Sequence, residues 1–391
     1  MKVSLINPNL SGDVSCYDIG LTYLATYLNE RTKHRAKIID YTFHRRNWEK
    51  HLHKKLIEQK PDIIGITTVS LYLKYIKDTI KEIRKYSDAP IILGGYHSSL
   101  DPEGSIKLEG VNAICIGNGE YAFTEYLDAI EKGKSIKGID GIWYKEGDKI
   151  IKNPLRPLIQ DIDSLPIPNY DLWEDIDKYF YFLGQGYFVG VRGCPFNCSY
   201  CSEYTMKKVF GVGGYIRKRN PREFAKEIKY QYEKYKDRGM RIAHCFDPVF
   251  TFDKEWLKEF SDEYKKIGMA NKLPLSVFAE ATAVDEERIK LLHEANCKII
   301  RIGIEAGNEK IRMQVYEKLV TDEQLKKAFA ACHKYGLVIT AYNMLGGPGE
   351  DKKTLNDTFR INKELNPSRP IFFIFRPLPH TRAMDKIKAL G

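Results

Sequence analysis

Several features that mark membrane and secreted proteins are missing from this sequence. No apolar run approaches the ~20 residues that a bilayer-spanning helix needs. Residues 1–7 have the pattern of a buried strand and not that of a signal peptide. Apart from three clustered cysteines, the thiols stand singly in apolar surroundings, as reduced core thiols do: Cys16, Cys115, Cys245, Cys297 and Cys332. We therefore expect a cytoplasmic protein.

A basic stripe for nucleic acid is also missing. The formal net charge is +10, but the lysines are spread along predicted helix faces, for example at Lys74, Lys77 and Lys326. No basic run interleaved with aromatic residues stands out. We therefore expect no nucleic-acid partner. The 391 residues and the 43% hydrophobic content allow two or more domains with full-sized cores.

Three cysteines do occur close together, within eight positions of a predicted loop: Cys194, Cys198 and Cys201. Three thiolates from one loop can hold three irons of a cubane cluster and leave the fourth iron open to a small molecule. Structural zinc prefers four ligands, and no second cysteine or histidine pair lies near this loop. The spacing therefore predicts an iron–sulfur cluster, with zinc or a chance grouping as the alternative.

The first third of the chain alternates apolar strands with amphipathic helices. The strands are expected at 2–7, 37–40, 61–67, 90–95 and 111–117. Strands that are apolar throughout indicate a parallel sheet covered on both faces. Residues 1–137 therefore predict an α/β domain with a flavodoxin-like (Rossmann) sheet.

A ligand crevice is expected where the strands of this sheet end, at the carboxyl edge beside the topological switch point. The loops there are rich in glycine and hydroxyl groups, which suits a large polar ligand. The alternative is that the glycines serve only the turns and that the histidine is structural. The candidate residues are Asn9, Thr67, Ser70, Gly94, Gly95, His97, Gly117, Gly119 and Glu120.

The rest of the chain divides into a linker and a second domain. Residues 138–183 contain a predicted hairpin and a proline-rich stretch, and we interpret them as a connector. Residues 184–391 resume the strand–helix alternation with six repeats, which predicts a partial (β/α)6 barrel open on one side. The cysteine loop follows the first of these strands, at 187–191, and barrel folds place their chemistry at such carboxyl ends.

The pattern Cys-x-x-x-Cys-x-Tyr-Cys resembles the signature of the radical S-adenosylmethionine (SAM) enzymes. The resemblance implies a [4Fe-4S] cluster on the three cysteines, with SAM bound to the open iron and Tyr200 near its adenine. Three later segments match motifs of the family in the same order, and they imply further SAM-binding residues. These are Asp247, Glu305 at a ribose hydroxyl, and the turn Gly346, Gly347 and Pro348 near the adenine.

The first domain resembles the cobalamin-binding domain of the cobalamin-dependent radical SAM family. The matching segments are Pro61–Gly65, Gly94–His97 and Gly117–Glu120. The family's Asp-x-His-x-x-Gly motif, which places a histidine under cobalt, is absent, because His44 follows Asp40 at the wrong distance. The resemblance therefore implies a cobalamin held without a histidine ligand.

The resemblance covers almost the whole chain and implies an enzyme that cleaves SAM to a 5′-deoxyadenosyl radical. The expected reaction is cobalamin-dependent methylation of an unactivated carbon in a small molecule or peptide. An external electron donor of the flavodoxin or ferredoxin type is expected as a partner. The alternatives are a non-methylating cyclisation or rearrangement, and a cobalamin or nucleotide sensor. Catalytic acid and base residues cannot be assigned.

Overall fold

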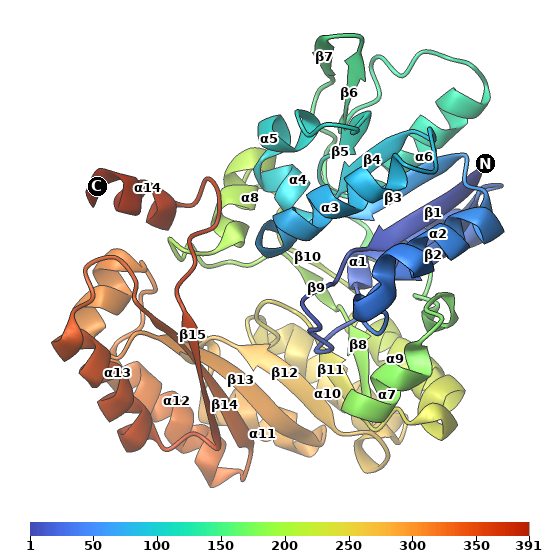
Figure 1. Cartoon of the computed structure of the whole chain (residues 1–391). Helices are drawn as coiled ribbons and strands as arrows, with labels where there is room; N and C mark the ends of the chain where they lie inside the picture. Colours follow the sequence, from blue (N-terminus) through green and yellow to red (C-terminus); the bar gives the residue numbers. More distant parts are fainter. Residues whose placement is uncertain (391) are drawn as a thin grey trace. The chain divides into compact units, whose positions relative to one another are not determined.

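The computed structural model describes residues 1–390 and divides the chain into two compact units. The first unit is Met1–Leu183 and the second is Gly184–Gly391. Each unit is built on its own sheet with helices packed on it (Figure 1). No helix in the described part of the chain is long and apolar enough to cross a membrane.

The sheet of the first unit has the strand order β2-β1-β3-β4-β5-β6-β7. The first five strands of this order pair in parallel, which confirms the predicted flavodoxin-like topology. The last two pair antiparallel as a hairpin on the β5 edge. The strands are β1 (Lys2–Asn7), β2 (Arg35–Asp40), β3 (Ile63–Thr67), β4 (Ile91–Gly94), β5 (Ala113–Cys115), β6 (Ile142–Glu146) and β7 (Lys149–Lys152).

Helices cover both faces of this sheet. Consecutive residues of the central strand, Ile63 and Ile64, are both fully buried although they point to opposite faces. On the helical layers, α1 packs against α6, and α2 packs against α3. The helices are α1 (Ile19–Arg31), α2 (Trp48–Gln59), α3 (Leu73–Ile83), α4 (Tyr96–Leu100), α5 (Pro102–Ile106), α6 (Gly119–Glu131) and α7 (Ile176–Leu183), with short 3₁₀ turns at Arg45–Asn47, Ser70–Tyr72, Ile162–Ser164 and Tyr170–Leu172.

The segment interpreted as a connector is packed into the first unit. Its hairpin, β6 and β7, extends the sheet. Farther along, the indole N–H of Trp173 donates to Oγ1 of Thr22 at 2.8 Å. The hydroxyl of Tyr179 donates to Oδ2 of Asp40 at 2.8 Å, where β2 ends. Residues 138–183 therefore complete the core of this unit.

The sheet of the second unit has the order β15-β14-β13-β12-β11-β8, with every pairing parallel. Six parallel strands in sequence order form the predicted partial barrel. The strands are β8 (Gln185–Phe188), β11 (Ile242–Cys245), β12 (Leu275–Ala279), β13 (Cys297–Glu305), β14 (Val338–Leu345) and β15 (Arg369–Ile374), and a small separate ladder pairs β9 (Val191–Arg192) with β10 (Arg217–Lys218).

In the described part of the second unit, α9 to α13 cover one face of this sheet. In β13, the side chains of Ile300, Ile302 and Ile304 are fully buried, while the residues between them are partly exposed. Neighbouring helices pack in chain order from α9 to α13. The helices are α8 (Ser202–Phe210), α9 (Pro221–Tyr235), α10 (Lys254–Lys266), α11 (Glu286–Glu294), α12 (Asp322–Lys334), α13 (Lys352–Leu365) and α14 (Arg382–Leu390), with a π-helical turn at Ile311–Val315 and 3₁₀ turns at Lys236–Arg238, Met269–Asn271 and Ala281–Ala283.

The first barrel strand is shorter than the sequence predicts. The strand expected at 187–191 is interrupted after Phe188, and Val191 starts the separate ladder. The cause is Gly190, whose carbonyl accepts a hydrogen bond from the backbone N–H of Arg219 at 2.8 Å. A Cβ at Gly190 would also lie only 2.9 Å from the ring of Phe224. The chain therefore leaves the sheet here and enters the cysteine loop.

Candidate functional site

The cysteine loop lies between β9 and α8. Cys194, Cys198 and Cys201 are all free and partly exposed, whereas the four singly placed cysteines from Cys115 onward are buried. The backbone N–H of Cys201 donates to the carbonyl of Cys198 at 3.2 Å, which folds the loop back on itself. Three accessible thiols therefore come from one tight turn.

These thiols are protonated when no metal holds them. Burial raises the pKa of the Cys194 thiol to about 11 and that of Cys201 to about 12. Among residues 1–390, no three His, Cys, Asp or Glu side chains converge as ligands of a single metal ion. A cubane cluster distributes its thiolates over different irons, so it does not require that convergence. Three partly exposed thiols on one tight turn fit such a cluster, and binding it releases their protons.

The loop is held from behind by a buried lysine. Nζ of Lys207, on α8, donates to the carbonyls of Pro195 and Phe196 at 3.1 and 2.7 Å and to Oδ1 of Asn197 at 2.7 Å. An ammonium group has three protons, and all three have acceptors here. Lys207 therefore fixes the backbone between the first two cysteines.

The other end of the loop is tied to the π-helical turn that follows β13. Oγ of Ser199 donates to the carbonyl of Val315 at 2.7 Å, and its backbone N–H donates to the carbonyl of Tyr316 at 2.8 Å. The carbonyl of Ser199 accepts from the N–H of Ala383 at 3.0 Å. The thiol-bearing loop is thereby rigidly connected to residues far away in the sequence.

Asp247 follows β11 and is completely buried. Its Oδ1 accepts a hydrogen bond from the backbone N–H of Val191, directly before the cysteine loop. Burial raises the pKa of this carboxyl group to about 7. Its Oδ2 is buried without a hydrogen-bond partner in the described structure. Asp247 therefore supports the base of the cysteine loop.

Glu305 ends β13 in a left-handed conformation, with φ of 67°. Burial raises its pKa, while the nearby ammonium of Lys318 and a hydrogen bond from the Tyr200 hydroxyl act in the opposite direction. Lys318 is itself buried and lies 3.5 Å from Oε1 of Glu280. A Cβ at Gly303 would overlap the Glu305 carboxylate and displace it from its present position. The structure thus brings Tyr200 and Glu305 together beside Cys198.

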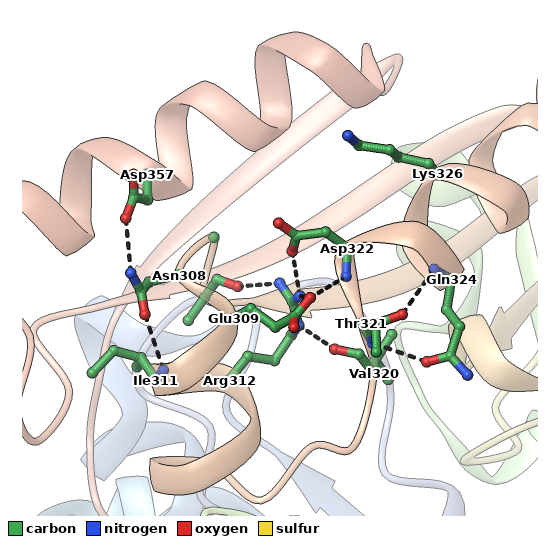
Figure 2. A network of polar contacts seen from close by, with 12 residues as sticks. Asn308, Glu309, Ile311, Arg312, Val320, Thr321, Asp322, Gln324, Lys326 and Asp357 are labelled. Atoms are coloured by element: carbon green, nitrogen blue, oxygen red, sulfur yellow. Dashed lines mark hydrogen bonds and ion pairs between the residues drawn. The ribbon is translucent and has the colours of Figure 1, made fainter.

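The loop after Glu305 is fixed by the fully buried guanidinium of Arg312 (Figure 2). Its Nε donates to the carbonyl of Val320 at 2.7 Å, and its Nη1 donates to that of Ala306 at 2.8 Å. Its Nη2 pairs with Asp322 at the start of α12. One side chain therefore joins the end of β13, the π-helical turn and α12.

The turn after β14 is held by hydrogen bonds from its own backbone N–H groups. The N–H groups of Gly346 and Gly347 both donate to Oε2 of Glu350, at 2.7 and 2.8 Å. A Cβ at Gly347 would lie 1.9 Å from the hydroxyl of Tyr316, so the close approach requires glycine. That hydroxyl is buried without a partner, and the ring of Tyr316 contacts the ring of Tyr200 at 5.5 Å. Pro348 follows, also buried, and completes the turn.

In the first unit, the candidate loops meet at the carboxyl edge of the sheet. Gly95 has φ of 100°, and a Cβ there would lie 3.0 Å from the carbonyl oxygen of Thr68. Oγ1 of Thr67 donates to Oδ2 of Asp18, which caps α1, at 2.8 Å. Gly94 ends β4, and its carbonyl accepts from Oγ1 of Thr68 at 2.7 Å. The loops after β3 and β4 are therefore in contact.

Further hydroxyl groups complete this edge. Oγ of Ser70 lies 2.9 Å from Nδ1 of the buried His97. The N–H of Gly117, which has φ of 85°, donates to Oγ of Ser99 at 3.0 Å. Gly119 and the buried Glu120 form the first turn of α6.

Asn9 is engaged inside its own loop. Its Nδ2 donates to the carbonyl of Asp13 at 2.6 Å and to Oγ1 of Thr42 at 3.0 Å, and its Oδ1 accepts from Ser11 at 2.7 Å. Exposed apolar side chains, Val69 and Leu71, flank the hydroxyl groups. An edge of glycines and hydroxyls with apolar neighbours fits a large ligand that has both a flat apolar ring and polar substituents.

Comparison with known proteins agrees with both sites. The family described as "Radical SAM superfamily" matches residues 188–361, and the "B12 binding domain" family matches residues 10–127. An uncharacterized methyltransferase of Pyrococcus horikoshii, PH0819, is 31% identical over 376 residues, which are 94% of this chain and 77% of that protein. The chain belongs to the radical SAM superfamily. Its first unit carries the B12-binding domain of the cobalamin-dependent branch.

Two further proteins resemble this radical SAM protein at lower sequence identity. The anaerobic magnesium-protoporphyrin IX monomethyl ester cyclase of Rubrivivax gelatinosus is 25% identical, over 88% of this chain and 61% of that protein. The solved structure of TsrM, a radical SAM methyltransferase of Kitasatospora setae with cobalamin and a [4Fe-4S] cluster bound, has a TM-score of 0.83 at 21% identity, covering 99% of this chain and 74% of that one. This likeness confirms the fold of each unit.

Four buried residues of the radical SAM unit escaped the sequence analysis: Lys207, Glu280, Tyr316 and Lys318. In the sequence they look like ordinary surface charges or a core aromatic ring, because their burial depends on segments that are distant along the chain. Glu280, Tyr316 and Lys318 lie close to Glu305, which has a left-handed φ. No residue pattern predicts that conformation for a glutamate. The spacing of residues in the sequence therefore does not predict the group of buried side chains around Glu305.

Proposed function

We propose that this radical SAM protein is a cobalamin-dependent methyltransferase that methylates an unactivated carbon of a small molecule or peptide. The observation that carries the proposal is the presence, in one chain, of a three-cysteine loop at the end of a barrel strand and a B12-binding domain. The 31% identical relative named as a methyltransferase supports the same reaction class. An external flavodoxin- or ferredoxin-type donor supplies electrons.

The radical SAM unit holds the cluster on Cys194, Cys198 and Cys201. When bound, the reduced cluster supplies the electron that cleaves SAM to a 5′-deoxyadenosyl radical. The Glu305 carboxylate accepts a hydrogen bond from a ribose hydroxyl of SAM, and the backbone at Gly346–Pro348 contacts the adenine. Asp247 holds the loop in position through Val191, so the thiols keep one orientation during the reaction.

The B12-binding unit places the corrin at the edge formed by the loops after β1, β3, β4 and β5. When bound, cobalamin supplies the carrier for the methyl group. His44 already has partners in this unit, because its Nε2 lies 2.8 Å from Oδ2 of Asp175 and its ring stacks on that of His51 with 3.8 Å between the centroids. The hydroxyls of Thr67 and Ser70 and the glycines at Gly94 and Gly117 bind the corrin and its side chains.

Uptake of hydroxocobalamin tests this assignment. We expect the purified full chain to retain about one corrin per chain on gel filtration, because the glycine- and hydroxyl-lined edge is already formed. The electron paramagnetic resonance spectrum of its Co(II) form should show no nitrogen coupling from a histidine. The variant Gly95→Val adds branched atoms where a Cβ already lies 3.0 Å from Thr68, and it should lose the corrin. A folded protein that retains no corrin would refute the methyl-transfer proposal while leaving the radical site intact.

Glu305→Ala should weaken SAM binding by about tenfold or more, since a buried hydroxyl left without an acceptor costs ~1–3 kcal/mol. Equilibrium dialysis of the anaerobic protein measures this. Glu323→Ala removes an exposed carboxylate of α12 and is the matched control, with no change expected. Equal SAM affinity in Glu305→Ala and Glu323→Ala would show that Glu305 is not part of the SAM site.

A further inference from the structure

The face of the second sheet that carries no helices is lined by aromatic side chains. We call these residues the aromatic band: Tyr187, His244, Phe246, Phe278, Tyr342 and Phe373. Side chains on a strand alternate between faces, and the alternate residues Cys245, Val277 and Ala341 are buried beneath the helices. The band therefore occupies the inner face of the partial barrel.

The rings form one continuous series across the strands. Tyr187 contacts His244 at 5.5 Å between ring centroids, His244 contacts Phe246 at 5.5 Å, and Phe246 contacts Phe278 at 5.5 Å. Phe278 and Tyr342 are nearly parallel at 6.2 Å, as are Tyr342 and Phe373 at 6.0 Å. These separations lie within the range in which aromatic rings attract each other. The side chains thus form one connected surface.

Part of this surface is open. Phe246 is 43% exposed and Phe373 is 52% exposed. Contiguous exposed aromatic rings are costly in water and mark binding surfaces more often than chance. The band also runs to the ends of the strands where Asp247 and Glu305 lie, since Phe246 directly precedes Asp247. A molecule on the band would therefore lie next to the proposed SAM site of the same unit.

The cationic side chain of Arg301 lies on the aromatic band. The guanidinium of Arg301, on β13, lies over the ring of Phe278 at 5.6 Å and donates to the Tyr342 side chain. Burial lowers its pKa, and in residues 1–390 the side chains that act on its charge are phenols and a thiol, with no carboxylate among them. A partly desolvated guanidinium without a counter-ion favours a bound anion, which it can hold with two parallel hydrogen bonds.

The neighbouring histidine adds no charge. Nη1 of Arg301 lies 3.1 Å from Nδ1 of His244. The same nitrogen also lies 3.2 Å from the carbonyl oxygen and 3.0 Å from Oγ of Ser276, so that a buried cation and two oxygens surround it. Burial and the Arg301 charge lower the pKa of His244 to about 3, in agreement with this geometry. The band therefore has one charge, and it is positive.

We propose that the aromatic band is the substrate surface of this protein and that it binds a planar aromatic ring system bearing a carboxylate or similar anionic group. The rings of Phe278, Tyr342 and Phe373 stack on the planar part, and Arg301 binds the anion. This inference rests on the proposed function, because it assigns the substrate class of that reaction.

Binding of 2-naphthoate to the reconstituted full chain, measured by isothermal titration calorimetry, tests the proposal. We expect saturable binding that weakens at least about tenfold in Arg301→Gln, since hydrogen bonds to a charged group are the strong ones. Phe373→Leu should weaken binding about threefold to tenfold through lost stacking. Arg369→Gln, which removes an exposed arginine at the other end of β15, is the matched control and should bind as the wild type does.

Two further probes separate the two recognition elements. The neutral 2-naphthamide and the non-aromatic cyclohexanecarboxylate should each bind at least about tenfold more weakly than 2-naphthoate. The proposal would be overturned if either probe bound as tightly as 2-naphthoate, or if Arg301→Gln and Arg369→Gln bound 2-naphthoate with equal affinity. It would also be overturned if 2-naphthoate showed no saturable binding. Deoxyadenosine formation by the wild type is measured separately, so a failure of the proposed function is distinguished from a failure of this substrate assignment.

Discussion

Replacing Cys198 with alanine is expected to remove the iron–sulfur cluster and to abolish 5′-deoxyadenosine formation. Cys198 is the central thiol of the loop, and the Tyr200 hydroxyl and the Lys318 ammonium both act on it. Two remaining thiols cannot hold three irons of a cubane. After anaerobic reconstitution, the visible absorption near the cluster band and the iron content should fall to the background level.

The matched control for this variant is Cys16→Ala, which removes a free, partly exposed thiol of the other unit. It should keep full iron content and full deoxyadenosine formation. Stoichiometric zinc with almost no iron in the wild type would contradict the cluster assignment. Iron retained in Cys198→Ala at the wild-type level would contradict the role of this cysteine.

Arg312→Met is expected to give the largest loss of stability, about 3–5 kcal/mol, because two backbone carbonyls lose the donor that a fully buried side chain provides, at ~1–3 kcal/mol each. The substitution leaves the carbonyls of Ala306 and Val320 without their donor, and Asp322 loses its cation (Figure 2). Urea unfolding followed by far-ultraviolet circular dichroism measures the change in the free energy of unfolding.

Arg360→Met serves as the comparison, because Arg360 is 66% exposed and pairs with Asp357 on the surface of α13. Exposed pairs contribute only ~0–1 kcal/mol, so this variant should be almost as stable as the wild type. A loss below about 1 kcal/mol in Arg312→Met would mean that the network around Arg312 does not stabilise the loop after Glu305. SAM affinity should fall in Arg312→Met as well, because that loop begins at Glu305.

Much of the architecture can be predicted from the sequence, because local patterns determine it. Apolar strands alternating with amphipathic helices are sufficient to predict both parallel sheets and their order. The strand at 338–345 agrees with the prediction at both ends, since Gly336 and Gly346, both with positive φ, bracket it. The cysteine loop is likewise predictable, because its three thiols are close together in the sequence.

The rest depends on contacts between distant segments. The interruption of the first barrel strand depends on Gly190 meeting Phe224, and the sequence does not indicate that contact. The side chains of Arg312 and Lys318 look like surface charges until residues from other elements enclose them. Asn9 looks free to bind a ligand, yet its own loop and Thr42 occupy its amide. The aromatic band is equally hidden, since its six rings come from five strands or their ends.

The central claim is that one chain uses a cluster-bound SAM and a cobalamin together, and product analysis tests it most directly. The reconstituted protein with hydroxocobalamin, SAM and a strong reductant should form both 5′-deoxyadenosine and S-adenosylhomocysteine. The first product should require the three cysteines, and the second should require cobalamin. Absence of deoxyadenosine from a protein with a full cluster, or S-adenosylhomocysteine formed equally fast without cobalamin, would contradict the account.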